Sequence, residues 1–175
     1  MTAADPPGGH FGDAASWAAG WRRQSTASAA IYGLVVSAAV MAAAGEHGTV
    51  FDVVTSVVVT VLIYWIAEAF SEVLGQQVAT AEPMGRGATL VLLRQRWALV
   101  EASYAPLVVV VAVRVLGGST DAAINAGLLT ATVMLAGFGW VAASRRGSAG
   151  FMRVATALLS ASFGVVMIAL KALLH

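Results

Sequence analysis

Five long apolar segments separated by polar connections dominate the chain. A helix needs about 20 predominantly apolar residues to cross a bilayer, because each residue adds about 1.5 Å toward a hydrocarbon core of roughly 30 Å. The five segments reach that length, and they cover approximately residues 26–44, 50–70, 97–116, 121–143 and 150–174. The pattern predicts an all-α fold, an integral membrane bundle of five transmembrane helices within one domain, 26–175.

Two stretches lie outside the predicted spans. Residues 1–25 are polar and contain turn formers such as Pro6 and Pro7, so we expect a disordered N-terminal segment. The connection 71–96 contains an apolar stretch, 88–93, that is too short to cross a bilayer. We expect this stretch to form a short interfacial helix before the third span, or to extend that span.

The basic residues orient the predicted bundle. Alternation of five spans puts Arg114 and Lys171 on one side of the membrane and the other eight of the ten Lys and Arg residues on the opposite side. Because basic residues concentrate in cytoplasmic loops, this split predicts a cytoplasmic N-terminus and an external C-terminus. The expected positions of four tryptophans, near inner helix ends, agree with this orientation: Trp21, Trp65, Trp97 and Trp140.

Composition narrows the class and the location of the protein. Hydrophobic residues make up 59% of the chain and charged residues 11%, against about 25% charged residues in soluble domains. The excess of arginine over lysine, with abundant alanine, glycine and valine, is typical of a high-GC bacterium. We therefore expect a bacterial protein of the plasma (inner) membrane.

Several kinds of site and partner are not expected. The chain has no cysteine, and its three histidines, His10, His47 and His175, fall at the ends or in a predicted loop, so we expect no metal and no cofactor. The net charge of +1, without a basic cluster rich in aromatics, argues against a nucleic-acid partner. The lipid bilayer is the expected partner, together with further copies of the chain or a larger membrane complex.

Polar residues recur at every fourth position along the second predicted span. Four residues turn a helix by about 400°, so successive members step around it by about 40° and form a slowly winding stripe. Hydrocarbon offers hydroxyls and carboxylates no partner, so the stripe is expected to face other helices or enclosed water. Its members are Asp52, Ser56, Thr60, Tyr64, Glu68 and Glu72.

The inner end of this stripe is the main candidate for function. Glu68 and Glu101 are predicted at similar depth, near Tyr64 and Tyr104. Two neighbouring carboxylates in a low dielectric share a proton readily, so they could handle protons or cations at the mouth of a pathway lined by Thr60 and Tyr64. The alternative is that both acids reach the inner headgroups or pair with the inner basic residues Arg94 and Arg96.

A second polar group is predicted at the outer side. We expect Arg114 to pair with Asp52 or Asp121, and the group to be mainly structural. Its alternative role is an outer gate for the same pathway. Small residues spaced by four, Ala29-Gly33-Ser37 in the first span and Ser160-Gly164 in the fifth, favour close approach of helices.

Three functional hypotheses follow from these features. The first is a channel or proton-linked transporter of ions or small solutes, acting as a homo-oligomer because five short helices enclose little space. The second is a membrane-embedded enzyme acting on a lipid or isoprenoid, which needs a lipid-accessible cavity around the acids. The third is an accessory subunit of a larger membrane complex, for which no cavity is expected. The sequence contains no recognisable catalytic motif, which weighs against the enzyme.

Overall fold

The described part of the chain is almost entirely helical. The computed structural model describes residues 11–44, 48–80 and 85–174. Within these ranges there is no strand, and the helices are α1 (Phe11–Ala44), α2 (Val50–Thr80), α3 (Arg86–Arg96), α4 (Ala98–Val115), α5 (Thr120–Arg145) and α6 (Gly150–Leu174). Five segments are long and apolar enough to cross a membrane, with α3 and α4 counting as one. The predicted all-α fold with five such helices is confirmed.

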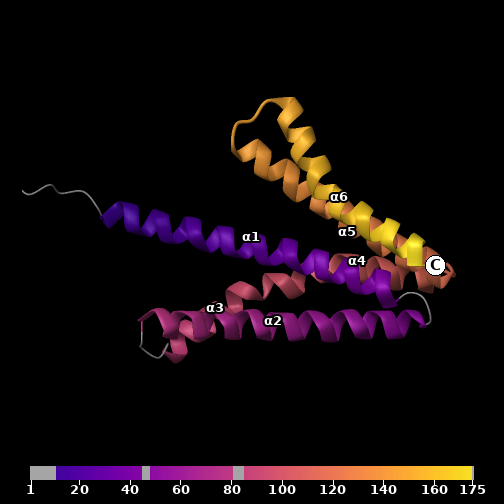
Figure 1. The fold of residues 1–175 in the computed structure, drawn as a ribbon, viewed down its shortest axis with the longest axis horizontal. Helices are drawn as coiled ribbons and strands as arrows, with labels where there is room; N and C mark the ends of the chain where they lie inside the picture. The colour runs from indigo at the N-terminus through magenta and orange to yellow at the C-terminus, as the bar shows by residue number, and fades with distance from the viewer. Residues whose placement is uncertain (1–10, 45–47, 81–84, 175) are drawn as a thin grey trace, which may run out of the picture.

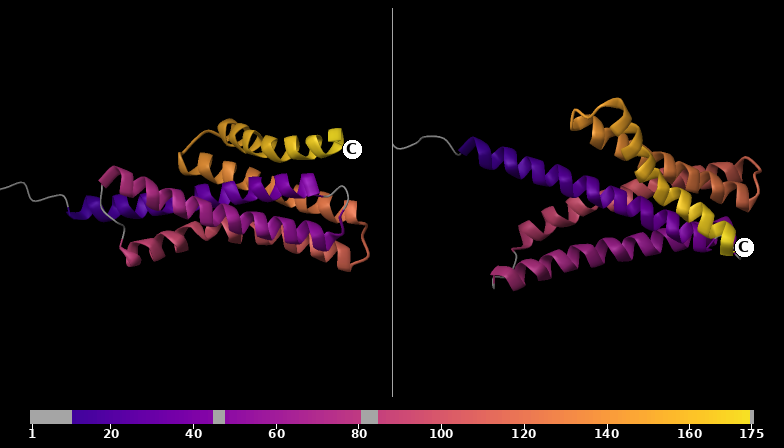
Figure 2. Two further views of the ribbon diagram at one scale, coloured as in Figure 1. Left: turned by 60° about the horizontal axis from the view of Figure 1, so that its bottom comes forward. Right: turned by 45° about the horizontal axis from the view of Figure 1, so that its top comes forward.

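The two ends of the bundle differ in charge and in shape. One end, which we call the arginine-rich end, includes the beginning of α1, the end of α2 and the α5–α6 connection, and it carries Arg86, Arg94, Arg96, Arg145, Arg146 and Arg153. The α4–α5 connection and the C-terminus lie at the opposite end (Figure 1). Figure 1 and the right-hand view of Figure 2 show the helices converging at this opposite end and spreading apart toward the arginines.

Two helices extend beyond the spans that hydropathy predicts. α1 begins at Phe11, so residues 11–25 are helical where a disordered segment was expected, and α2 continues to Thr80. Residues 1–10 of that expected segment lie outside the described residues. Both extensions are rich in alanine, glutamine and glutamate or arginine, which favour helix. Hydropathy did not predict these extensions, because it measures how well a segment enters lipid and does not measure whether a helix continues beyond the membrane.

A local break at Trp97 separates α3 from α4. The Trp97 N–H bonds to the Arg94 carbonyl, 3.3 Å away and three residues back, rather than to the Leu93 carbonyl four residues back. The indole Nε1 of Trp65 on α2 donates to that Leu93 carbonyl at 3.1 Å. The side chain of one helix thus satisfies the backbone group that the break releases in another, as buried carbonyls require.

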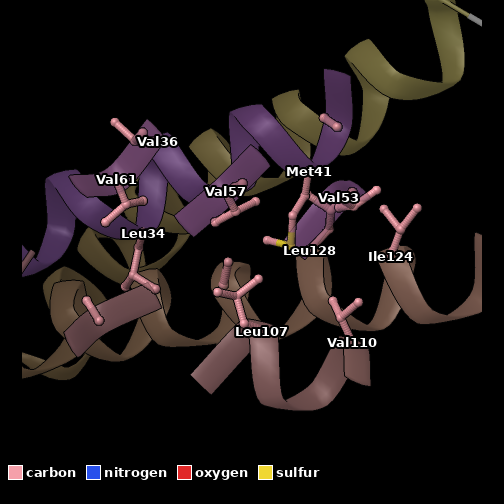
Figure 3. Close-up of a cluster of buried hydrophobic side chains, with 14 of the residues drawn as sticks. Leu34, Val36, Met41, Val53, Val57, Val61, Leu107, Val110, Ile124 and Leu128 are labelled. Carbon is pink, nitrogen blue, oxygen red and sulfur yellow. The ribbon is translucent and has the colours of Figure 1, made fainter. Parts of the chain in front are cut away.

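The packed core lies mainly toward the opposite end of the bundle. It brings together the second half of α1, the first half of α2, and the facing parts of α4 and α5 (Figure 3). Its members in Figure 3 include Leu34, Met41, Val53, Val57, Leu107, Val110, Ile124 and Leu128. α2 and α6 contribute least and are the most exposed of the spanning helices. The core therefore fills the half of the bundle away from the arginines.

Small residues bring the helices into close contact. Lipid tails are as apolar as leucine, so helices in a membrane associate through tight packing and hydrogen bonds rather than through the hydrophobic effect. Gly33 on α1 lies directly against the Leu99 carbonyl on α4, and the Ser37 hydroxyl donates to the Ser103 hydroxyl at 2.7 Å. Gly164 on α6 lies against Thr132 on α5 in the same way. Both small-residue patterns thus lie at helix contacts.

Candidate functional site

Arg96 connects α3 to α2 through two carboxylates. Its guanidinium donates from Nη1 to Glu68 Oε1 at 2.6 Å and from Nη2 to Glu72 Oε2 at 3.0 Å. The Arg96 side chain is 14% exposed and the Glu68 side chain 26%, so this ion pair is largely shielded from water. Two buried atoms, Glu68 Oε2 and Arg96 Nε, have no hydrogen-bond partner in the described part of the chain. We call these three residues the arginine clamp.

The arginine clamp decides between two interpretations of Glu68. The pairing with Arg96 is the alternative that the sequence left open, and it makes Glu68 a partner of a fixed cation rather than of Glu101. A guanidinium that binds carboxylates on another helix in this way contributes to the association of the two helices. Of the two predicted basic partners, Arg96 pairs with the acids, whereas Arg94 forms no ion pair with any described residue.

Glu101 lies in a different place, in the wall of a cavity of about 750 Å³. Its lining residues belong to the half of the bundle that carries the arginines, where α1 and α5 spread apart (Figure 1). Helices α1, α3, α4 and α5 supply its wall: Thr26, Ala27, Ala30, Gln95, Ala98, Glu101, Ala102, Met134, Phe138 and Arg145. Four alanines in this list leave the space that larger side chains would fill. Glu68, Tyr64 and Thr60 do not line this cavity.

The charged groups of this cavity are available to a ligand. Within the described ranges, the Glu101 side chain has no hydrogen bond and no ion pair, and it is exposed to the cavity. Arg145 lines the same cavity without pairing with Glu101. A carboxylate of this kind can accept hydrogen bonds from a cationic group of a ligand. The wall therefore offers Glu101 to a cationic group and Arg145 to an anionic group.

A smaller, largely apolar cavity of about 140 Å³ shares one lining residue, Phe138, with the first. Its other lining residues are Ile31, Val35, Leu135, Ser160 and Phe163. The large cavity therefore has charged groups in its wall, whereas the lining of the smaller cavity contains none.

The remaining residues of the predicted pathway lie apart from Glu101's cavity. Tyr64 packs edge-on against Tyr32 on α1, with ring centroids 5.7 Å apart and an interplanar angle of 71°. Thr60 is half-buried beside the apolar face of α2, and Tyr104 is exposed on α4. The polar stripe therefore does not form a single line of groups leading to Glu101.

The residues of the predicted outer cluster, Asp52, Arg114 and Asp121, have contacts other than those expected. Asp52 Oδ2 accepts hydrogen bonds from the backbone N–H and the hydroxyl of Thr49, both at 2.8 Å, which caps the start of α2. Asp121 lies 3.6 Å from the Lys171 ammonium, which also donates to Asn125 at 3.0 Å. Arg114 is exposed and has no ion partner among the described residues, so its expected pairing with Asp52 or Asp121 is not found. These contacts attach helix ends, as a structural role requires.

Sequence reasoning missed Arg145 and Gln95 as neighbours of Glu101. The alternation of spans puts Arg145 and Glu101 at the same end of the bundle, but it does not indicate that the end of α5 and the start of α4 line one cavity. A signal did exist in the paired alanines, Ala27 and Ala30 on α1 and Ala98 and Ala102 on α4, whose spacing puts a small-residue face on each helix. Such faces mark either close packing or a cavity.

Known proteins do not add to this description. Comparisons of the chain with protein-family models, with curated proteins and with solved structures give no match. The function must therefore be inferred from the chemistry of the cavity and its position in the bundle.

Proposed function

We propose that the protein is a multi-pass protein of the plasma membrane with its arginine-rich end in the cytoplasm. Alternation of the five spans puts eight of its ten Lys and Arg residues at this end, and basic residues favour cytoplasmic loops. α2 has 31 residues and is therefore about 46 Å long, against a hydrocarbon core of roughly 30 Å. Its excess length supports an α2 end and an α3 helix at the inner membrane interface.

We further propose that the protein is a proton-linked transporter of a small amphipathic solute, loaded from the cytoplasmic side. The observation that carries this proposal is the Glu101 carboxylate, which has no ion pair or hydrogen bond among the described residues and lines a cavity of about 750 Å³ whose wall also contains Arg145. A carboxylate in this position can exchange a proton for a cationic group of the solute. It replaces Glu68, which the arginine clamp occupies, as the proposed proton-handling residue.

The packing of the bundle favours a carrier over an open channel. Beyond the cavity, the core of α1, α2, α4 and α5 is filled by residues that include Leu34, Met41, Val110 and Leu128. A channel formed by one chain needs a continuous polar path through this region. A carrier needs only a cavity that is open to one side at a time, which fits this state of the bundle.

The cavity wall indicates the chemistry of the solute. Glu101 suits an ammonium group, and Arg145 suits a carboxylate or phosphate, which its guanidinium binds in bidentate fashion. Met134 and Phe138 suit a hydrocarbon portion, and Phe138 also lines the neighbouring, largely apolar smaller cavity. The preferred solute class is therefore a zwitterion with an apolar part, and competition between its ammonium group and a proton for Glu101 gives exchange of solute for proton.

The alternative functions fit the cavity less well. An embedded enzyme acting on a lipid would use the same cavity, with Glu101 as general acid, but the sequence contains no recognisable catalytic motif. An accessory subunit has no need for a cavity of this size. Oligomerisation is not required to form the proposed binding site, because four helices of one chain build it.

Proton exchange in liposomes tests the transporter. Purified protein is reconstituted into vesicles that contain a trapped pH-sensitive dye, and leucine or lysophosphatidylethanolamine is added as a zwitterionic probe. Wild-type protein is expected to move protons when one of these probes is added. Glu101→Gln is expected to abolish this coupling, because a glutamine amide does not take up or release a proton. Arg145→Gln is expected to weaken probe binding by about tenfold, because it removes a charge-assisted contact.

Glu72→Gln is the matched control, because Glu72 is an acid of the same half of the bundle that does not line the cavity. It is expected to retain coupling. Probe-dependent proton movement that persists unchanged in Glu101→Gln would rule out the role proposed for this carboxylate. The absence of movement with both probes in the wild type would count against the transporter itself.

A further inference from the structure

A second, separate groove of about 440 Å³ lies between α2 and the α3–α4 junction. Its lining residues are Trp65, Leu90, Leu93, Arg94 and Trp97, none of which lines the Glu101 cavity. The transport proposal makes no use of this groove. Its walls are almost wholly apolar, with a single charged group, Arg94.

The break between α3 and α4 shapes this groove. The indole rings of Trp65 and Trp97 meet edge to face, with centroids 5.1 Å apart and an interplanar angle of 84°. The hydrogen bond from Trp65 to the Leu93 carbonyl fixes the first ring against the end of α3. Two large rings held at nearly a right angle leave an apolar recess beside them, with Leu90 and Leu93 as its other side.

Arg94 differs from Arg96 in having no ion-pair partner among the residues that the structure describes. Arg96 gives both of its terminal nitrogens to Glu68 and Glu72. Arg94 is exposed at the groove and forms no ion pair within the residues that the structure describes. Glu68 and Glu72 are already bound by Arg96, so no described acid neutralises the positive charge at the groove.

We propose that this groove binds one anionic phospholipid, with the phosphate on Arg94 and part of an acyl chain on Trp65, Trp97 and Leu90. The charge is complementary, because a guanidinium donates two parallel hydrogen bonds to a phosphate. The depth also fits, because indoles favour the headgroup level and basic recesses between membrane helices bind anionic headgroups. The bilayer supplies such a lipid at this interface wherever the arginine-rich end meets anionic headgroups.

The bound lipid has a structural consequence. Residues of α2 and α3, with Trp97 directly before α4, line the groove. A bound lipid therefore contacts the same two helices that the arginine clamp connects. Lipid in the groove therefore holds α3 against α2 and shields the Trp65–Leu93 hydrogen bond from water. A lipid that binds only when α3 packs against α2 stabilises this packing by mass action.

Native mass spectrometry of the delipidated protein in detergent tests the lipid site. Phosphatidylglycerol and phosphatidylcholine of the same chain length are added separately, and the populations with bound lipid are measured. The wild type is expected to bind one phosphatidylglycerol about fivefold more tightly than phosphatidylcholine, and Arg94→Gln to lose that preference. Arg94→Lys, which keeps the charge, is expected to retain a preference for the anionic lipid.

Arg86→Gln is the control, because Arg86 is an exposed arginine of the same helix that does not line the groove. It should bind phosphatidylglycerol as the wild type does. Inorganic phosphate at the same concentration should fail to displace the lipid, since it cannot occupy the apolar recess. Retention of the preference in Arg94→Gln, an equal loss in Arg86→Gln, or displacement by phosphate alone would each overturn the proposal.

Discussion

Two arginines close together in the sequence have different surroundings in the structure. Arg94 and Arg96 are two positions apart on α3, which rotates them by about 200° around the helix. Arg96 consequently faces Glu68 and Glu72 on α2, whereas Arg94 faces the tryptophan groove. The spacing alone predicts that the two point in opposite directions, but not which one meets the acids. That choice depends on the rotation of α3, which the break at Trp97 and the Trp65 hydrogen bond set.

At this residue scale, the arginine clamp gives a stability prediction. Arg96→Gln leaves Glu68 and Glu72 without their cation in a partly buried position, so it is expected to lower the free energy of unfolding by about 1–3 kcal/mol. Thermal unfolding in detergent without phospholipid measures this change. Arg94→Gln is the control, expected within about 0.5 kcal/mol of the wild type because its side chain has no protein partner in the described chain. Equal effects of the two substitutions would contradict the clamp.

At the scale of helices, the sequence predicts which segments span better than it predicts where helices end. The last predicted span, 150–174, coincides with α6. The predicted end of the first span and the predicted start of the second coincide with the end of α1 at Ala44 and the start of α2 at Val50. Apolar length is a direct physical requirement for crossing a bilayer, so hydropathy reports it well. The helical segments 11–25 and 71–80 are polar, and no membrane requirement marks them.

The glycine contacts between helices lead to a second stability prediction. Gly33 lies against the Leu99 backbone of α4, and an added methyl group would meet that carbonyl, which cannot move without shifting the helix. Gly33→Ala is therefore expected to destabilise the bundle by about 1–3 kcal/mol. Gly137→Ala is the matched control, since nothing lies within 4 Å of the added carbon and alanine favours helix.

Unfolding of both variants in a denaturing detergent series measures the difference. Gly33→Ala should unfold earlier than the wild type, and Gly137→Ala at the same point or slightly later. If Gly33→Ala were as stable as Gly137→Ala, the close contact of α1 with α4 would be disproved.

At the scale of the whole molecule, the site depends on how the helices cross. The sequence placed Glu68 and Glu101 at similar depth and paired them on that basis. Depth follows from counting residues, whereas contact also depends on rotation and crossing angle, which close contacts such as Gly33 with Leu99 help to set. The structure therefore divides the two acids between the arginine clamp and the open cavity. Four alanines in the cavity wall, with the spreading of the helices toward the arginine-rich end (Figure 1), accompany the cavity at this end.

The central claim of this account is that the cavity beside Glu101 opens to the cytoplasm and is closed toward the outside. The chain contains no cysteine, so a single cysteine can be introduced without altering any other position. Ala98 lines the cavity, and Ser119 lies in the α4–α5 connection at the opposite end. Labelling by a membrane-impermeant maleimide in inverted and in right-side-out vesicles then compares the two positions.

The account predicts that Ala98→Cys is labelled in inverted vesicles only and Ser119→Cys in right-side-out vesicles only. Labelling of Ala98→Cys from the outside, or its complete protection in both kinds of vesicle while Ser119→Cys reacts, would contradict it.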